Sequence, residues 1–163
     1  MTCFWDETLK GLSNFPEFNL KVSKSKFIEF CQTNCDIMLQ RYKYVIWEGF
    51  DINNRDKSES GIDINKPNIR EQDIIEHHIP HIKTLCEQDK INGYDCGSCD
   101  SFLLFLCCYF KMNIHYKSKN WNNSNIQTRY LYNNPDNPIG YENNKALFFS
   151  TSKSHFSYVS YVK

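Results

Sequence analysis

The feature that most constrains this chain is the segment Phe102 to Phe110, which is apolar on nearly every side. Asp100 and Ser101 stand directly before it, and both are residue types that cap the amino terminus of a helix. A helix that is apolar all round has to be buried on most sides. The segment therefore predicts a central core helix with other elements layered around it.

Behind this segment the hydrophobic pattern changes from a helical to an alternating period. The alternating runs are separated by turns rich in Asn, Pro, Gly and Ser, and they span Met112 to Tyr116, Gln127 to Tyr132, Ala146 to Phe149 and His155 to Val162. Runs of this kind predict strands. We expect them to form a small antiparallel sheet.

The front half of the chain is patterned for helices. Apolar residues recur at helical spacing behind Cys3, Ser23 is placed to cap a second helix, and Ile69 to Gln88 is helical with Pro80 marking a kink or a new start. Tyr42 to Trp47 is expected to be a short strand or an extended piece. The predicted fold class is α+β, with a helical front half packed on the carboxyl-terminal sheet.

The length of 163 residues suits one domain spanning 1–163. The stretch 51–67 is almost entirely polar and is expected to be a surface loop. The 19 basic and 19 acidic residues give a net charge of +0 without a block of one sign, so nucleic acid is not an expected partner. No membrane span or secretion signal is apparent, which predicts a soluble, cytoplasmic monomer with reduced cysteines.

The two ends of the chain carry residues suited to thiol catalysis. Cys3 heads the first predicted helix, where the helix dipole favours a thiolate, and His155 opens the last predicted strand, where its imidazole could take up the thiol proton. The stretch Cys3-Phe4-Trp5-Asp6-Glu7-Thr8-Leu9 resembles the nucleophile helix of ovarian-tumour (OTU) type cysteine peptidases. The stretch Lys153-Ser154-His155-Phe156-Ser157-Tyr158-Val159 is similar to their histidine strand.

The middle of the chain extends this resemblance. Gly93-Tyr94-Asp95, the apolar helix and the strand from Met112 to Tyr116 follow in the order found in OTU peptidases, and the cysteine-rich segment also looks like OTU-like proteins of large DNA viruses. The resemblance implies a papain-like superfamily fold and a deubiquitinase. Ubiquitin or a ubiquitin-like protein would be the partner, in the host cytoplasm if the source is viral, and no cofactor or metal would be needed.

Two positions depart from the OTU pattern. The family usually has an Asp-Gly-x-Cys loop that helps to form the oxyanion hole, and here only Met1 and Thr2 precede Cys3. The residue that orients the histidine is often Asp or Asn, whereas Ser157 stands at that position. Asn143 or Asn144 is an alternative orienting group.

Cys99 is the alternative nucleophile. Cys96-Gly97-Ser98-Cys99-Asp100-Ser101-Phe102 is similar to the papain signature and also precedes the buried helix. Asp100 replaces the tryptophan of that signature, and a neighbouring carboxylate raises the pKa of a thiol. His155 also follows Cys99 by only 56 residues, where papain-like enzymes use about 130 to 150.

Metal binding is a weaker interpretation. Cys96 and Cys99 form one C-x-x-C pair, which Cys107 with Cys108 or His115 could complete, but adjacent helical cysteines point about 100° apart. His77, His78 and His81 lack a carboxylate pattern and are expected to be solvated surface histidines. We therefore expect buried, reduced cysteines at 107 and 108.

The two alternatives to an OTU-type isopeptidase are a non-catalytic OTU-like binding module and a papain-like peptidase using Cys99.

Overall fold

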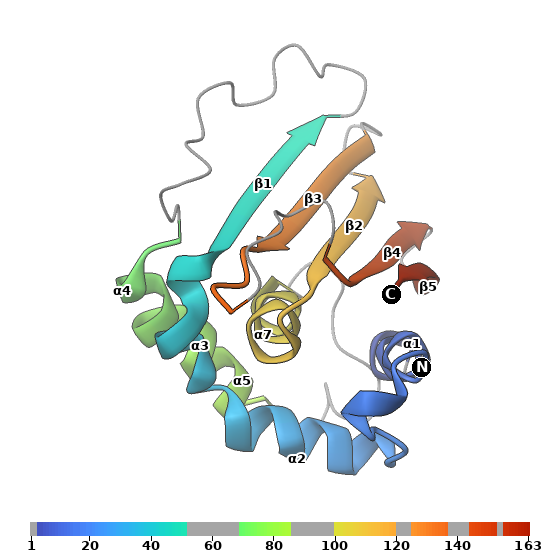
Figure 1. The fold of residues 1–163 in the computed structure, drawn as a ribbon, viewed down its shortest axis with the longest axis horizontal. Coiled ribbons are helices and arrows are strands. Elements are labelled where there is room, and N and C mark those ends of the chain that lie inside the picture. The colour runs from blue at the N-terminus through green and yellow to red at the C-terminus, as the bar shows by residue number, and fades with distance from the viewer. Residues whose placement is uncertain (1–2, 52–68, 86–99, 120–124, 137–143, 153–154) are drawn as a thin grey trace.

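The protein is described by a computed structural model that covers residues 3–51, 69–85, 100–119, 125–136, 144–152 and 155–163. Its helices gather on one side of a five-stranded sheet (Figure 1). The helical elements are α1 (Cys3–Leu12), η1 (Pro16–Phe18), α2 (Lys24–Asn34), α3 (Ile37–Arg41), η2 (Tyr42–Tyr44), α4 (Glu71–Asp73), η4 (Ile74–His78), α5 (Ile79–Lys83) and α7 (Asp100–Phe110). The strands are β1 (Val45–Asp51), β2 (Asn113–Lys119), β3 (Asn125–Tyr132), β4 (Ala146–Ser152) and β5 (His155–Val162).

The α+β class is confirmed, but the prediction of an antiparallel sheet is wrong in one pairing. The strands lie in the order β1-β3-β2-β4-β5, and β2 runs parallel to β4 while the other neighbours are antiparallel. The front half of the chain also contributes a strand, β1, which begins and ends later than the strand or extended piece predicted from Tyr42 to Trp47. The sheet is therefore mixed rather than a product of the carboxyl-terminal third alone.

The parallel pair follows from where the chain crosses the end of the sheet. β3 runs antiparallel to β2 and so ends beside the start of β2, and β4 then begins on the other side of β2 at that same end. Two asparagines fasten this crossing. The Asn113 side chain accepts a hydrogen bond from the Tyr132 N–H at 2.8 Å, and the Asn144 amide donates to the Tyr132 carbonyl at 3.1 Å.

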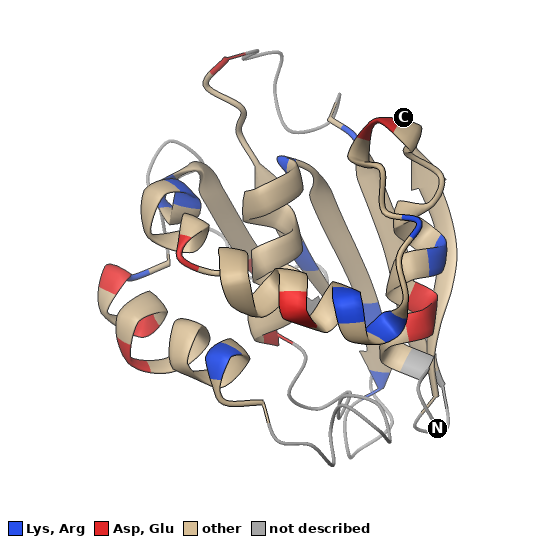
Figure 2. Ribbon diagram, turned by 90° about the horizontal axis from the view of Figure 1, so that it is seen from below, with Lys and Arg blue, Asp and Glu red and all other residues tan. Residues whose placement is uncertain are grey.

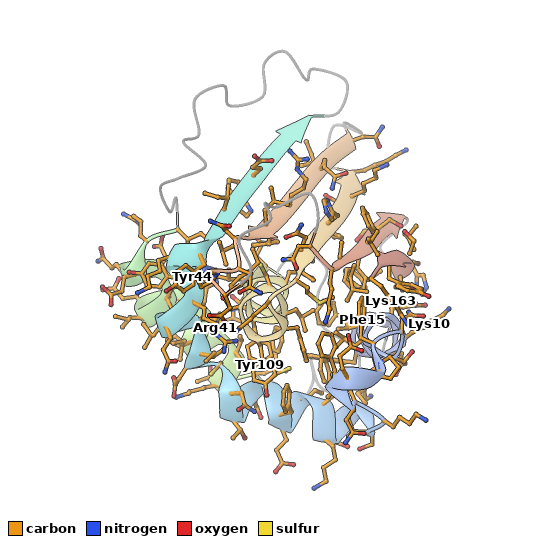
Figure 3. The ribbon with its side chains drawn as sticks, viewed as in Figure 1. Lys10, Phe15, Arg41, Tyr44, Tyr109 and Lys163 are labelled. Carbon is orange, nitrogen blue, oxygen red and sulfur yellow. The ribbon has the colours of Figure 1, made fainter. Side chains whose placement is uncertain are left out.

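The predicted core helix is confirmed as α7, which starts at Asp100 and ends at Phe110. Every residue from Ser101 to Cys108 is buried, because the sheet covers one side of the helix and other helices cover the rest (Figure 1). Arg41 lies at the carboxyl-terminal end of α7 near Tyr109 (Figure 3) and donates to the Cys108 and Tyr109 carbonyls, each at 3.0 Å. Carbonyls in the last turn of a helix have no N–H donor within the helix, and Arg41 supplies donors for two of them.

The first and last elements of the described chain pack together. Phe4 of α1 contacts Phe156 of β5 with ring centroids 4.9 Å apart. The Tyr158 N–H donates to Glu7 at 3.1 Å, and Asn14 donates to the Tyr158 hydroxyl at 2.9 Å. Helix α1 therefore lies against both one face and the outer edge of β5 (Figure 1).

The helical segment predicted from Ile69 is confirmed from Glu71 to Lys83, with a widened turn in the middle. Residues Ile74–His78 form a π-helical turn, and Pro80 follows it after Ile79. Proline has no N–H to donate to the carbonyl four residues earlier, so a regular α-helical ladder is interrupted there. Widened turns of this kind are often found at functional sites.

The remaining predictions have mixed outcomes. The Ser23 cap is confirmed, since its side chain accepts from the Lys26 N–H. In the stretch 51–67, Asp51 ends β1 and the rest lies outside the described residues. No helix among the described segments is long and apolar enough to cross a membrane. Basic and acidic positions are mixed along the helices (Figure 2).

Candidate functional site

The structure brings the start of α1 and the start of β5 close together. Cys3 is the first residue of α1 and His155 is the first residue of β5. Their chain neighbours, Phe4 and Phe156, are both fully buried and in ring contact. The chain neighbours of the two predicted catalytic residues thus pack against each other, and the Cys3 side chain lies outside the described atoms.

The side chains of β5 are divided between the two faces of the sheet. Phe156 and Tyr158 face α1, as their contacts with Phe4 and Asn14 show. Successive side chains of a strand point to opposite faces. The side chains of His155 and Ser157 therefore leave the strand on the face away from α1. His155 is exposed and Ser157 is half-buried. Since β5 pairs with β4 alone among the described strands, no strand closes its outer edge.

Asn144 is not brought to His155. It precedes β4, whose first residue Ala146 pairs with Val162, whereas His155 pairs with Ser152 at the opposite end of the strand. Six residues of strand separate these ends, which is about 20 Å. Its amide is bound to the Tyr132 carbonyl, so Asn144 stabilises the crossing and does not orient His155.

A third element start reaches the same end of the molecule. Phe102, in the first turn of α7, has its ring centroid 5.0 Å from Trp5 and 6.0 Å from Phe4. The beginnings of α1, α7 and β5 therefore converge through Phe4. Cys99, the alternative nucleophile, lies outside the described residues, but its covalent neighbour Asp100 is the first residue of α7.

His78 is a functional candidate that the sequence analysis missed. It was expected to be a solvated surface histidine, and instead it is half-buried with its Nδ1 2.8 Å from the Ser101 hydroxyl of α7. Burial, followed by the nearby charge of His77, lowers the pKa of His78 below its ordinary value. The ring is thus neutral at neutral pH and is fixed in orientation by Ser101, which are properties of a catalytic base.

No sequence pattern marked His78, because its partner Ser101 is 23 residues away in the chain. The available signal was Pro80, which predicted an irregularity in this helical segment. The neighbouring His77 is exposed. The expectation of a solvated surface histidine therefore holds for His77 and fails for His78.

A cavity of about 230 Å³ opens beside His78 at the amino-terminal end of α7. It lies between α7, the widened turn η4 and the helix-facing side of β1 and β3. Its lining residues are Trp47, Ile69, Asp73, His78, Asp100, Leu104 and Tyr130. The Tyr130 hydroxyl donates to Asp100 at 3.1 Å, and Arg70 forms two hydrogen bonds with Asp73 at 2.9 and 3.0 Å.

The four cysteines whose side chains the structure describes are buried, as predicted for Cys107 and Cys108. Burial raises the pKa of Cys31, Cys35, Cys107 and Cys108. None of these thiols is therefore a ready thiolate. Within the described segments, no group of three or more His, Cys, Asp and Glu side chains is placed to hold a metal ion.

In an OTU-like peptidase the modifier's tail would enter a narrow channel, and the sequence candidates for lining it are Trp5, Trp121 and Tyr158. The two of these that the structure describes differ in their access to solvent. Trp5 is fully buried in the core, so it cannot line an open substrate channel. Tyr158 is half-buried and holds Asn14, while Trp121 lies outside the described residues.

The molecule is thus an α+β domain in which three element starts and a half-buried histidine gather at one end. Comparisons of the chain with protein-family models, with curated proteins and with solved structures found no match.

Proposed function

We propose that the protein is a cysteine-dependent isopeptidase that cleaves ubiquitin or a ubiquitin-like modifier from other proteins, with Cys3 as nucleophile and His155 as base. The observation that carries this proposal is the contact between Phe4 and Phe156, whose ring centroids are 4.9 Å apart. It supports a close approach of two residues that are 152 positions apart in the sequence.

The position of Cys3 suits a nucleophile. α1 is a helix of 10 residues, and the positive end of its dipole stabilises a thiolate at its first residue. Phe4 and Trp5 anchor that first turn in the core, so the backbone that carries the thiol is held in place. A fixed nucleophile lowers the entropy cost of reaching the attack geometry.

The edge position of β5 supports the role of His155. The His155 side chain leaves β5 on the sheet face away from α1. Glu7 of α1, however, lies along the outer edge of β5 and accepts a hydrogen bond from the Tyr158 N–H. A His155 ring turned over this edge would face the start of α1. Its exposure leaves it accessible to a substrate, and Ser157, two residues on, shares its face and could hydrogen-bond to it.

The proposed reaction has two halves. The Cys3 thiolate attacks the carbonyl carbon of the modifier's terminal glycine, and the C–N bond to the lysine breaks as His155 gives its proton to the leaving amine. Water then attacks the thioester, with His155 taking up its proton, which releases the free carboxylate and restores the thiol. Backbone N–H groups near Cys3 would stabilise the oxyanion in both halves.

The second candidate is a thiol peptidase that uses Cys99. It is favoured by the oriented, neutral His78 and by the cavity at the start of α7, because Asp100, the covalent neighbour of Cys99, lines that cavity. His78 or His155 would then be the base. This candidate shares the chemistry of the first and differs in the residues.

The test is a ubiquitin that carries an electrophilic carbon at its carboxyl end, followed by mass spectrometry to map the labelled cysteine. Under the proposal, Cys3→Ala abolishes labelling and His155→Ala reduces it by at least about 100-fold, the usual worth of a general base. Cys99→Ala and the surface control His77→Ala should label like the wild type.

The alternatives give distinct results. Loss of labelling in Cys99→Ala and His78→Ala, with Cys3→Ala unaffected, would establish the second candidate. A wild-type protein that binds ubiquitin but never forms the adduct would be an OTU-like binding module without catalysis. A protein that neither binds nor labels would remove the assignment to ubiquitin.

A further inference from the structure

The cavity at the start of α7 has walls of two chemical kinds. Trp47, Ile69 and Leu104 supply apolar surface, while Asp73, His78, Asp100 and Tyr130 supply polar groups. Trp47 and Asp100 are exposed and Leu104 is buried, so the cavity runs from solvent towards the core. A ligand that matches it needs an apolar stem together with a polar head.

The charge of the cavity comes mainly from Asp100. Asp73 is paired with Arg70 through two hydrogen bonds, which balances its charge. Among the residues that the structure describes, no lysine or arginine forms an ion pair with Asp100. The Tyr130 hydroxyl fixes one carboxylate oxygen of Asp100 at 3.1 Å, and the other oxygen has further acceptor capacity.

We propose that this cavity binds an alkylammonium group, such as a lysine side chain, with its nitrogen at Asp100 and its methylenes against Leu104 and the Trp47 indole. A carboxylate forms a charge-assisted hydrogen bond with an ammonium group. An aromatic ring attracts the same cation through its face. The site would exist whether or not Cys3 is a nucleophile.

The other lining groups are compatible with a bound cation. His78 is held by Ser101, and burial lowers its pKa, so it adds no positive charge at neutral pH. An anion would meet Asp100 and Asp73 at close range, and a wholly apolar ligand would strip water from both carboxylates. The metal alternative lacks support, since the described residues offer no cluster of three ligands.

The size of the cavity also points to a side chain rather than a larger molecule. Its volume of about 230 Å³ is below the range of roughly 300 to 1,000 Å³ that is typical of drug-sized ligands. Four methylenes and an ammonium group fit this space.

The proposal is tested by titrating the full chain with n-butylamine at constant ionic strength, using two-dimensional NMR with the Trp47 indole N–H assigned through Trp47→Phe. Under the proposal, the shifts centre on Trp47, His78 and Asp100, and n-butanol binds at least about tenfold more weakly because it lacks the charge. Equal binding of the alcohol and the amine would overturn the proposal, as would shifts centred elsewhere.

Asp100→Asn is the decisive variant and has a matched control. It removes the charge while keeping the shape, and it should weaken amine binding at least about tenfold. Asp136→Asn makes the same change at an exposed carboxylate that pairs with Lys111 beyond the other end of α7, and it should leave binding unchanged. If Asp100→Asn fails to fold, Tyr130→Phe tests the same carboxylate by releasing its hydrogen bond, and unaltered affinity in the folded variant would overturn the proposal.

A second ligand separates the two sources of the ammonium group. Nα-acetyl-lysine N-methylamide carries the same amine on a peptide backbone. Tighter binding than that of n-butylamine would identify a lysine of a protein as the ligand, and exclusion of the peptide with retained amine binding would identify a free small amine. Both results keep the ammonium site, whereas failure of both ligands to bind would refute it.

Discussion

The two ends of α7 are finished in different ways. At the carboxyl-terminal end, Arg41 binds two backbone carbonyls and the surrounding side chains are packed against it. At the amino-terminal end, Ser101 holds a histidine, Asp100 holds a tyrosine, and a cavity remains. The carboxyl-terminal end of this buried helix, its closed end, is therefore stabilised by hydrogen bonds from Arg41. The amino-terminal end, its open end, places polar groups beside a cavity.

This difference suggests a division of labour along one helix. Changes at the closed end should cost stability and leave binding and labelling intact. Changes at the open end should alter the chemistry of the site at a small cost in stability.

Arg41→Met should lower the free energy of unfolding by about 2 to 3 kcal/mol, because the Cys108 and Tyr109 carbonyls lose a charged donor in a partly buried setting. Denaturant unfolding measures this change. The control is Lys111→Met, which removes a more exposed pair with Asp136 and should cost less than about 1 kcal/mol. Equal losses in the two variants would mean that the closed end is not stabilised by Arg41.

His115 lies on β2 between the core residues Ile114 and Tyr116, so its ring points to the sheet face away from α7, and it provides the reference for acid sensitivity. Burial, followed by the charge of Arg129, lowers the pKa of His115 to about 4, and its ring stacks on Phe148 at a centroid distance of 4.4 Å. Because the folded pKa lies below the unfolded value of about 6.5, stability is full above pH 6.5 and is lost as the pH falls towards 4.

The expected loss from His115 is about 2 kcal/mol, after allowing for the solvent screening of a half-buried ring. Unfolding free energies measured between pH 7 and 4 should therefore fall less steeply in His115→Gln. NMR titration of the ring protons gives the pKa directly. Titration of His115 at an ordinary value would contradict the prediction.

The two adjacent cysteines of α7 should respond unequally to serine. Both are fully buried, but the Cys107 thiol is directed at the Tyr130 carbonyl at 3.7 Å, so a serine hydroxyl at 107 has an acceptor. We expect Cys108→Ser to cost about 2 kcal/mol and Cys107→Ser about 1 kcal/mol or less. Stoichiometric zinc in the wild type that is lost in these variants would instead reveal a metal site.

Ser101→Ala should have the smallest effect on stability, about 1 kcal/mol, because one hydrogen bond to a half-buried ring is lost. Its effect on His78 should be larger, since the ring loses the partner that fixes its tautomer. The 15N shifts of the imidazole report that change. Ser13→Ala, at an exposed hydroxyl that donates to the Lys10 carbonyl, is the control and should leave those shifts unaltered.

The elements of this fold could be predicted from the sequence because their signals are local. The apolar run from Phe102, the cap at Ser23 and the alternating run from His155 each place an element within a few residues of its observed bounds. A hydrophobic period depends on neighbours in the chain, so one sequence is enough to reveal it.

The sheet order and the candidate site could not be predicted in the same way. The parallel pairing depends on where Asn113 and Asn144 fasten the chain crossing, and no local pattern encodes that choice. His78 looked identical in kind to His77 until the fold placed Ser101 against it. Interactions between distant residues decide both features, and these arise only when the layers assemble.

The packing of α1 on β5 has a consequence for the order in which the chain folds during synthesis. About 140 residues separate the end of α1 from the start of β5, so at about 5 to 20 residues per second the ribosome needs roughly 7 to 28 s to supply the partner strand. Throughout that interval the side of α1 that carries Phe4 has no β5 to cover it. The nascent chain therefore exposes this apolar face of α1 early and covers it only after β5 has been synthesised.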